Sequence, residues 1–161
     1  MRKLALVFTV LLISSCQYKK KEDNTNLENR NKILKIQKDY VDSWLQMDEQ
    51  KVLFLFEDDA RIQPNRLAPI EGKENMRAFW FPKDGSQTTI NSYETELVGI
   101  DITDTIAIST QKSNLDWSYT KDTISFSMFQ RGVGTTIYRK QKDSSWKIWR
   151  QMWTDVYSKK K

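Results

Sequence analysis

Apolar residues recur with a helical period in the first part of the chain. Between residues 27 and 45 they follow one another at steps of three and four, which indicates one long helix with a broad apolar face. Asp48 is placed to cap a second, shorter helix that carries Val52–Phe56. A third helix is expected over Lys73–Trp80. The first half of the chain is therefore predicted to be mainly helical.

Shorter features separate these helices. Glu57–Asp59 is typical of a turn, and Ala60–Gln63 alternates like a short strand that Pro64 ends. Asn65–Glu71 is expected to be a loop.

From Thr88 onward the apolar period changes to two, which is typical of strands with one buried face. The segment Thr120–Gly132 is ambiguous and is interpreted as a flexible loop or a frayed strand extension, because glycines follow its alternating part. The strands expected on either side of it are Ile90–Ile102, Thr105–Tyr119, Gly134–Lys142 and Ser145–Tyr157. Helices followed by a long antiparallel meander predict an α+β fold, with the helices laid on one sheet face.

The first residues do not belong to this domain. Arg2 and Lys3 precede the apolar run Leu4–Ile13, which is too short to span a bilayer but suits a secretory signal. The run ends in Ile13-Ser14-Ser15-Cys16, which resembles the lipobox of bacterial lipoproteins. That resemblance implies a signal peptide over residues 1–15, lipidation of Cys16 and a polar tether over residues 16–26. An ordinary signal peptide with a chance cysteine is the alternative.

The resemblance places the protein in the bacterial cell envelope, held to the membrane through its lipid alone. The outer membrane is the expected site. Lys21-Glu22-Asp23 loosely resembles a surface-export signal, so a surface-exposed location is also open.

The positive charge of the chain lies at its ends. The whole chain carries a formal charge of +5, but residues 24–158 hold 18 Lys or Arg and 19 Asp or Glu. The basic residues cluster near the N-terminus and in a tail over residues 158–161, outside the domain expected at 27–157. This distribution argues against a nucleic-acid partner, which would select a basic stripe across the domain.

The chain contains no histidine and one cysteine. Zinc sites built from these residues and Ser-His or Cys-His nucleophile pairs are therefore excluded, and no metal or cofactor is expected. Any acid–base chemistry must use Asp, Glu, Lys or Tyr.

The order of these elements and several local motifs resemble the nuclear transport factor 2-like superfamily, including its polyketide-cyclase-like and ketosteroid-isomerase-like members. The matching motifs are Tyr40-Val41-Asp42-Ser43-Trp44, Leu55–Ile62, Ile70–Arg77, Gly134–Lys140 and Trp146–Arg150. The resemblance implies a cone-shaped, strongly curved sheet wrapped around the long N-terminal helix, with a cavity at its wide end.

Aromatic residues on the last strand support a pocket. Trp149, Gln151, Trp153 and Asp155 are expected on one face, where rings alternating with polar groups suit a pocket mouth. The predicted lining residues are Tyr40, Trp44, Phe56, Trp80, Trp117, Thr136, Tyr138, Trp149 and Trp153. The alternative is that these rings fill a compact core.

The opposite face of that strand is also predicted to be apolar, through Trp146, Ile148 and Met152. Such a face needs a cover. The loop Thr120–Gly132 is one candidate, and a homodimer formed through the sheet is the favoured one.

The isomerase resemblance implies three catalytic groups, of which this chain keeps one. Tyr40 falls at the position of the family tyrosine, but the base position falls at Pro64, beside Gln63, and the second donor falls near Thr136. Asp155 is the nearest substitute for the buried acid of the cyclase relatives, although an exposed strand-end carboxylate is its simpler reading.

The sequence thus predicts an envelope lipoprotein whose pocket binds a small hydrophobic or aromatic molecule without catalysis. Two alternatives remain open: a cofactor-independent isomerase, cyclase or hydratase using Tyr40 and an acidic residue, and a protein-interaction domain with a vestigial pocket.

Overall fold

A computed structural model of the chain describes residues 25–161. Its helices are an N-terminal helix described over residues 25–45, α2 (Glu49–Phe54) and α3 (Lys73–Trp80). Its strands are β1 (Phe56–Gln63), β2 (Ile70–Glu71), β3 (Gln87–Ile102), β4 (Ile106–Lys121), β5 (Ile124–Lys140) and β6 (Trp146–Lys160). The first and third helices lie where they were predicted, whereas the second ends at Phe54, and Phe56, predicted to be helical, begins β1.

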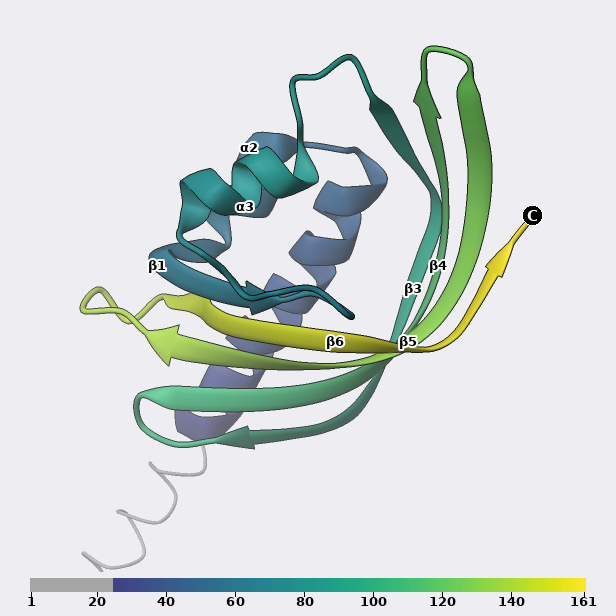
Figure 1. Ribbon diagram of the computed structural model, residues 1–161. Helices are drawn as coiled ribbons and strands as arrows, with labels where there is room; N and C mark the ends of the chain where they lie inside the picture. Colours follow the sequence, from purple (N-terminus) through teal and green to yellow (C-terminus); the bar gives the residue numbers. More distant parts are fainter. Residues whose placement is uncertain (1–24) are drawn as a thin grey trace, which may run out of the picture.

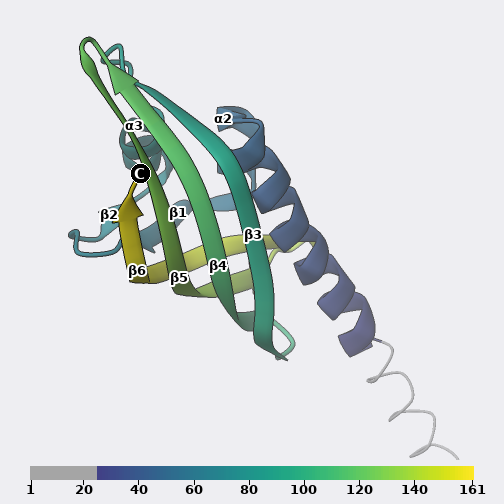
Figure 2. The same ribbon diagram turned by 90° about the vertical axis from the view of Figure 1, so that its right-hand side faces the viewer.

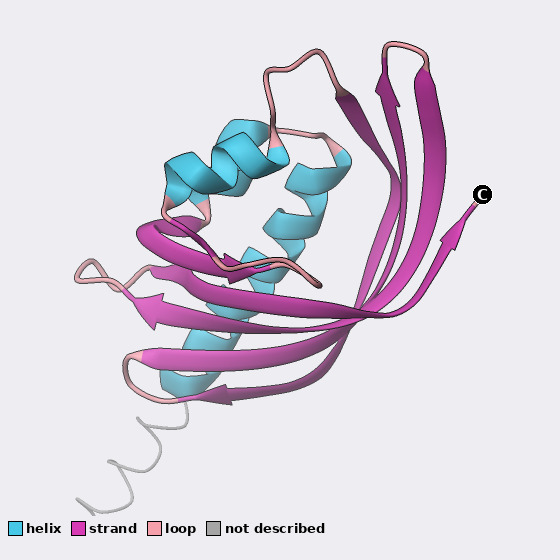
Figure 3. Cartoon of the chain, viewed as in Figure 1, coloured by secondary structure: helices cyan, strands magenta, loops and turns pink. Residues whose placement is uncertain are grey.

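One bent sheet of six strands, in the order β2-β1-β6-β5-β4-β3, carries the fold (Figure 3). Neighbouring strands are antiparallel, except that β1 runs parallel to β6. The sheet curves around the N-terminal helix, and α2 and α3 lie across the open end of the curve (Figures 1 and 2). The α+β fold with a curved sheet around a long helix is confirmed.

The helix ends and the core follow from the local sequence. Asp48 caps α2, because its Oδ1 accepts the Lys51 backbone N–H at 3.0 Å. The core lies between the N-terminal helix, α2, α3 and the sheet. Its fully buried side chains include Ile33, Val52, Phe56, Ile62, Met76 and Ile148.

The strands are longer than their sequence pattern indicates. Glu57–Asp59, expected to be a turn, belongs to β1. Thr120–Gly132, interpreted as a flexible loop or a frayed strand extension, is a tight hairpin between β4 and β5, which pair continuously from Lys121 and Ile124 onward. The hairpin turn is possible because Asp122 adopts a left-handed conformation with φ of 51°.

The predicted basic tail is also strand. β6 continues to Lys160, and Ser158, Lys159 and Lys160 pair with Gln130, Phe129 and Met128 of β5. The sheet therefore extends three residues beyond the expected end of the domain at Tyr157.

Bulges in β6 decide which side chains face inward. Tyr138 pairs with Ile148 while Ile137 pairs with Arg150, so Trp149 is an extra residue in β6. The inward face consequently changes from even to odd residue numbers at this point, from Ile148 to Gln151. A second bulge lies between Gly132 and Arg131.

The bulge at Trp149 changes the predicted dimer face. Trp146 and Ile148 are 4% and 2% exposed and belong to the core, whereas Met152, between the inward-facing Gln151 and Trp153, borders the cavity and is 50% exposed. The three residues do not share a face, because the bulge at Trp149 lies between them.

Residues 1–24, with Cys16, lie outside the described part of the chain, so the signal peptide, the lipid and the tether remain predictions. Among residues 25–161, no helix is long and apolar enough to cross a membrane.

Candidate functional site

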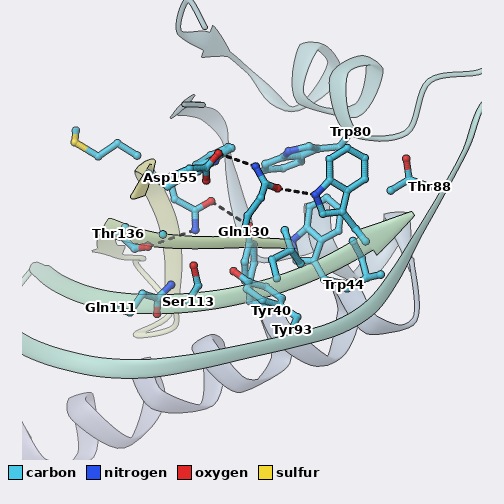
Figure 4. Close-up of a pocket in the computed structure, with 18 of the residues that line it drawn as sticks. Tyr40, Trp44, Trp80, Thr88, Tyr93, Gln111, Ser113, Gln130, Thr136 and Asp155 are labelled. Atoms are coloured by element: carbon cyan, nitrogen blue, oxygen red, sulfur yellow. Dashed lines mark hydrogen bonds between the residues drawn. The ribbon is translucent and has the colours of Figure 1, made fainter. Parts of the chain in front are cut away.

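A cavity of about 350 Å³ lies between the N-terminal helix, α3 and the concave face of β3, β4, β5 and β6. Figure 4 shows its lining side chains converging from these elements. The residues that line it are Tyr40, Trp44, Phe79, Trp80, Thr88, Ile90, Tyr93, Gln111, Ser113, Leu115, Trp117, Gln130, Gly132, Gly134, Thr136, Gln151, Met152, Trp153 and Asp155. Its volume is within the range of small-molecule sites.

Aromatic rings build the helical side of the cavity. Trp44 and Trp80 meet edge to face, with ring centroids 5.3 Å apart. Tyr40 meets Trp44 at 6.1 Å and Tyr93, on β3, at 6.3 Å. Phe81 stacks on Trp44 from behind at 5.5 Å. Because each ring contacts another, the wall is fixed without a ligand.

A short chain of neutral polar groups forms part of the cavity surface. The Tyr40 hydroxyl donates to Gln151 Oε1 at 3.2 Å, and Gln151 Nε2 donates to Thr136 Oγ1 at 3.4 Å. Burial raises the pKa of Tyr40 well above its ordinary value, although the hydrogen bonds partly offset this effect. Tyr40 is therefore a neutral hydrogen-bond donor at physiological pH.

A second polar chain contains the one carboxylate among the lining residues. Trp117 Nε1 donates to Gln130 Oε1 at 2.6 Å, and Gln130 Nε2 donates to Asp155 Oδ2 at 2.6 Å (Figure 4). Asn65 Nδ2 donates to the same oxygen at 2.9 Å. Asp155 is thus held in place from both sides and is partly buried, not an exposed strand-end carboxylate.

Two glycines on β5 keep this part of the cavity open. A β-carbon on Gly132 would lie 3.0 Å from the Thr154 carbonyl oxygen and 3.2 Å from Ser113 Oγ. One on Gly134 would lie 3.3 Å from the Met152 carbonyl oxygen. Glycine at these positions reflects close approach of backbone, not a flexible loop.

Six of the nine predicted lining residues lie at the cavity, and three do not. Phe56 and Tyr138 are buried behind the wall, at 0% and 1% exposure. Trp149 lies on the outer face, where the guanidinium groups of Arg139 and Arg150 sit 4.6 and 4.2 Å from its ring centre. The six at the cavity are Tyr40, Trp44, Trp80, Trp117, Thr136 and Trp153.

Several lining residues were not predicted from the sequence. Phe79, Ile90, Tyr93, Gln111, Leu115 and Gln130 also line the cavity. Tyr93, Gln111 and Leu115 lie in predicted strands, but alternation alone does not tell which of two faces is concave. Gln130 lies in the segment interpreted as a flexible loop or a frayed strand extension.

The three catalytic groups implied by the isomerase resemblance are not assembled here. Gln63 and Pro64 do not line the cavity, and Gln63 Nε2 donates to the Leu67 carbonyl oxygen. Thr136 lies near Tyr40, but Gln151 is hydrogen-bonded to both. Asp155 alone among the lining residues could act as a general base. Within residues 25–161 no group of three His, Cys, Asp or Glu could hold a metal ion.

Sequence comparison identifies no relative: no protein-family model matches the chain, and no curated protein is similar to it. Structural comparison does find similar folds. A ketosteroid isomerase-like protein from Erwinia carotovora atroseptica matches 78% of this chain and 94% of its own, with a TM-score of 0.66 and 12% identity.

Two further structures show the same likeness. A nuclear transport factor 2-like protein from Cytophaga hutchinsonii matches 79% of this chain and 98% of its own, with a TM-score of 0.64 and 15% identity. A hexachlorocyclohexane dehydrochlorinase from Novosphingobium barchaimii matches 86% and 94%, with a TM-score of 0.64 and 13% identity. At such low identities the likeness concerns the fold, and on that ground the chain has the cone-shaped α+β fold of nuclear transport factor 2-like and ketosteroid isomerase-like proteins.

Proposed function

We propose that this protein binds a small hydrophobic or aromatic molecule in the cavity and does not transform it. The observation that supports this proposal is a preformed wall of contacting rings around about 350 Å³ of space. The hydroxyls and the amide of the first polar chain, Tyr40, Gln151 and Thr136, are hydrogen-bonded to one another. Their proposed role is to orient the ligand, not to react with it.

The test is a titration with N-phenyl-1-naphthylamine, a neutral dye whose fluorescence rises in apolar surroundings. It uses the full chain with Cys16→Ala, so that no lipid is attached. Ser113 lines the cavity, and the next residue, Asn114, is exposed on the other face of β4. Ser113→Phe should fill the cavity and abolish binding, whereas Asn114→Phe should bind the dye like the parent.

Two results would refute the binding proposal. One is the absence of saturable binding of this dye and of a panel of steroids and quinones, which would favour a protein-interaction domain with a vestigial pocket. The other is equal binding by the Ser113→Phe and Asn114→Phe proteins, which would place the dye on the outer surface.

We also propose that the protein is a lipoprotein of the bacterial cell envelope. The support is the run Ile13-Ser14-Ser15-Cys16 after a short apolar segment. Metabolic labelling with a palmitate analogue should label the wild-type chain and not Cys16→Ala. Equal labelling of the two would contradict the lipid anchor.

A homodimer through the outer sheet face remains part of the proposal, with corrected residues. Val98 and Ile108 are 57% and 42% exposed on β3 and β4, and no described helix covers this side (Figure 2). Light scattering at micromolar concentration should give twice the protomer mass, and Ile108→Glu should reduce it. A protomer mass for the parent protein would refute the dimer.

Catalysis is a second candidate because Tyr40 and Asp155 line the same cavity. In a cofactor-independent isomerase, cyclase or hydratase, Asp155 would take the proton and Tyr40 would donate to the developing oxyanion. If a turnover is found, Tyr40→Phe should lower kcat far more than it weakens binding. Turnover that survives both Tyr40→Phe and Asp155→Asn would exclude this assignment.

A further inference from the structure

The charge that lines the cavity is of one sign, negative. Among its lining residues Asp155 is the only one charged at neutral pH, and none is a lysine or an arginine. The remaining polar groups are neutral hydroxyls, amides and indole N–H groups. A protein that bound an anion here would leave the anion's charge unpaired beside a carboxylate.

Asp155 has one carboxylate oxygen available for a ligand. Both of its amide partners, Gln130 and Asn65, donate to Oδ2. Within residues 25–161 no group donates to Oδ1. Oδ1 lies 3.7 Å from where a β-carbon of Gly132 would be, so the missing side chain leaves this oxygen uncovered.

The aromatic residues favour the same sign of charge. The face of an indole or phenol ring carries negative potential and attracts cations, most strongly for tryptophan. Trp117 is held next to Asp155 through Gln130, and Trp153 lies two residues before Asp155 on the same face of β6. A cation at Asp155 would therefore have rings close to it.

The positive charges on this side of β6 lie farther along the strand. The Lys160 ammonium sits 5.4 Å from the ring centre of Phe126, which in turn contacts Trp117. Neither Lys160 nor Phe126 is among the lining residues. Arg131 stacks at 4.7 Å on Tyr157 at the outer face of the sheet. Asp155 thus has no cationic partner in the described part of the chain.

From this arrangement we propose that the cavity selects a protonated amine attached to an aromatic or hydrophobic body, and rejects the matching carboxylate. The ammonium group would donate to Asp155 Oδ1, and the body would lie against Trp80, Trp153 and Tyr93. This proposal rests on the proposed binding function and names the chemical class of its ligand.

Three indoles that differ in charge test the selection. Tryptamine is a cation, tryptophol is neutral and indole-3-acetate is an anion. Each is used to displace N-phenyl-1-naphthylamine from the full chain with Cys16→Ala. Tryptamine should displace half of the dye at a concentration about tenfold lower than tryptophol does, because a hydrogen bond to a charged group is worth at least a tenfold change in Kd. Indole-3-acetate should be the weakest competitor.

Variants show whether Asp155 causes the preference. Asp155→Asn keeps an oxygen for Gln130 and should bring the three indoles within about threefold of one another. Thr88→Lys adds a cation to the lining and should favour indole-3-acetate, while Thr89→Lys, at an exposed neighbouring position, should change nothing. The second pair gives the answer if Asp155→Asn does not fold.

The outcomes separate the two proposals. If the dye binds but the three indoles displace it equally, or not at all, the charge selection is wrong and the binding function stands. The selection is also wrong if indole-3-acetate is the best competitor, or if the preference for tryptamine survives in Asp155→Asn. If the dye itself does not bind, the binding function fails first.

Discussion

Replacing Tyr40 by phenylalanine removes one hydroxyl from the cavity and should destabilise the fold. Tyr40→Phe leaves the ring and its edge contacts with Trp44 and Phe56, at 6.1 and 6.2 Å, in place. It removes the hydroxyl that donates to Gln151 Oε1 at 3.2 Å. Gln151 is 7% exposed, so bulk water does not replace the lost tyrosine hydroxyl, and Oε1 is left without a donor.

The state of the acceptor left behind sets the cost. A hydrogen bond between neutral groups contributes about 1 kcal/mol, and its loss costs about 1–3 kcal/mol when the buried acceptor is left unpaired. Gln151 also lines the cavity, so the lower part of that range applies. Tyr40→Phe should therefore lower the free energy of unfolding by about 1–2 kcal/mol.

The assay is urea denaturation followed by circular dichroism, with Tyr93→Phe as the matched control. Tyr93 faces Tyr40 across 6.3 Å in the same cavity, but its hydroxyl has no hydrogen-bond partner in the described part of the chain. Its loss should change the free energy of unfolding by no more than about 0.5 kcal/mol.

A double-mutant cycle locates the effect. Once Gln151 is replaced by leucine, Tyr40→Phe should cost about 1 kcal/mol less than in the parent, because the acceptor is already gone. Equal costs for Tyr40→Phe and Tyr93→Phe would refute the role of the hydrogen bond. So would an unchanged cost of Tyr40→Phe in the Gln151→Leu background.

Three further perturbations follow from the same contacts. Gly132→Ala puts a β-carbon 3.0 Å from a backbone oxygen and should destabilise by about 1–3 kcal/mol in urea, whereas Gly99→Ala, with nothing within 4 Å, should be nearly neutral. Arg139→Ala leaves the buried Glu57 without its guanidinium partner and should lower the free energy of unfolding by about 1–3 kcal/mol. Adding Glu57→Gln should restore part of that stability. If it restores none, Arg139 acts through packing alone. Burial raises the pKa of Tyr40, Tyr93 and Tyr138. The unfolded chain therefore loses these phenol protons near pH 10, about the ordinary pKa of tyrosine, while the folded chain keeps them. Stability should therefore fall as the pH rises above about 10, by up to about 1.4 kcal/mol per pH unit for each tyrosine, and phenolate absorbance from all three appearing before unfolding would contradict this.

The sequence predicted helices and strands well where apolar residues recur with a regular period on the face that packs against the core. The helical period of residues 27–45 and the cap at Asp48 depend on neighbours within a few residues, and both are present in the structure. The segment Thr120–Gly132 is ambiguous in the sequence because Gly132 is expected to weaken a strand. In the structure Gly132 lies where β6 passes too close for a side chain, which only a long-range pairing can reveal.

The candidate site was predicted less completely, for a similar reason. Alternation placed Trp149 and Trp153 on one face, but a one-residue bulge at Trp149 puts them on opposite faces. The same bulge moved Trp146 and Ile148 from the expected dimer surface into the core. Asp155 was expected to be exposed because the amides that hold it, Asn65 and Gln130, are distant in the chain.

The most direct measurement of the central claim is a crystal structure of the protein grown with N-phenyl-1-naphthylamine. We expect density for the dye inside the ring-lined cavity, in contact with Trp80, Tyr93 and Trp153, with these side chains close to their present positions. Density for the dye only on the outer sheet face, with the rings of Trp80 and Trp153 packed together over Tyr93, would contradict the claim.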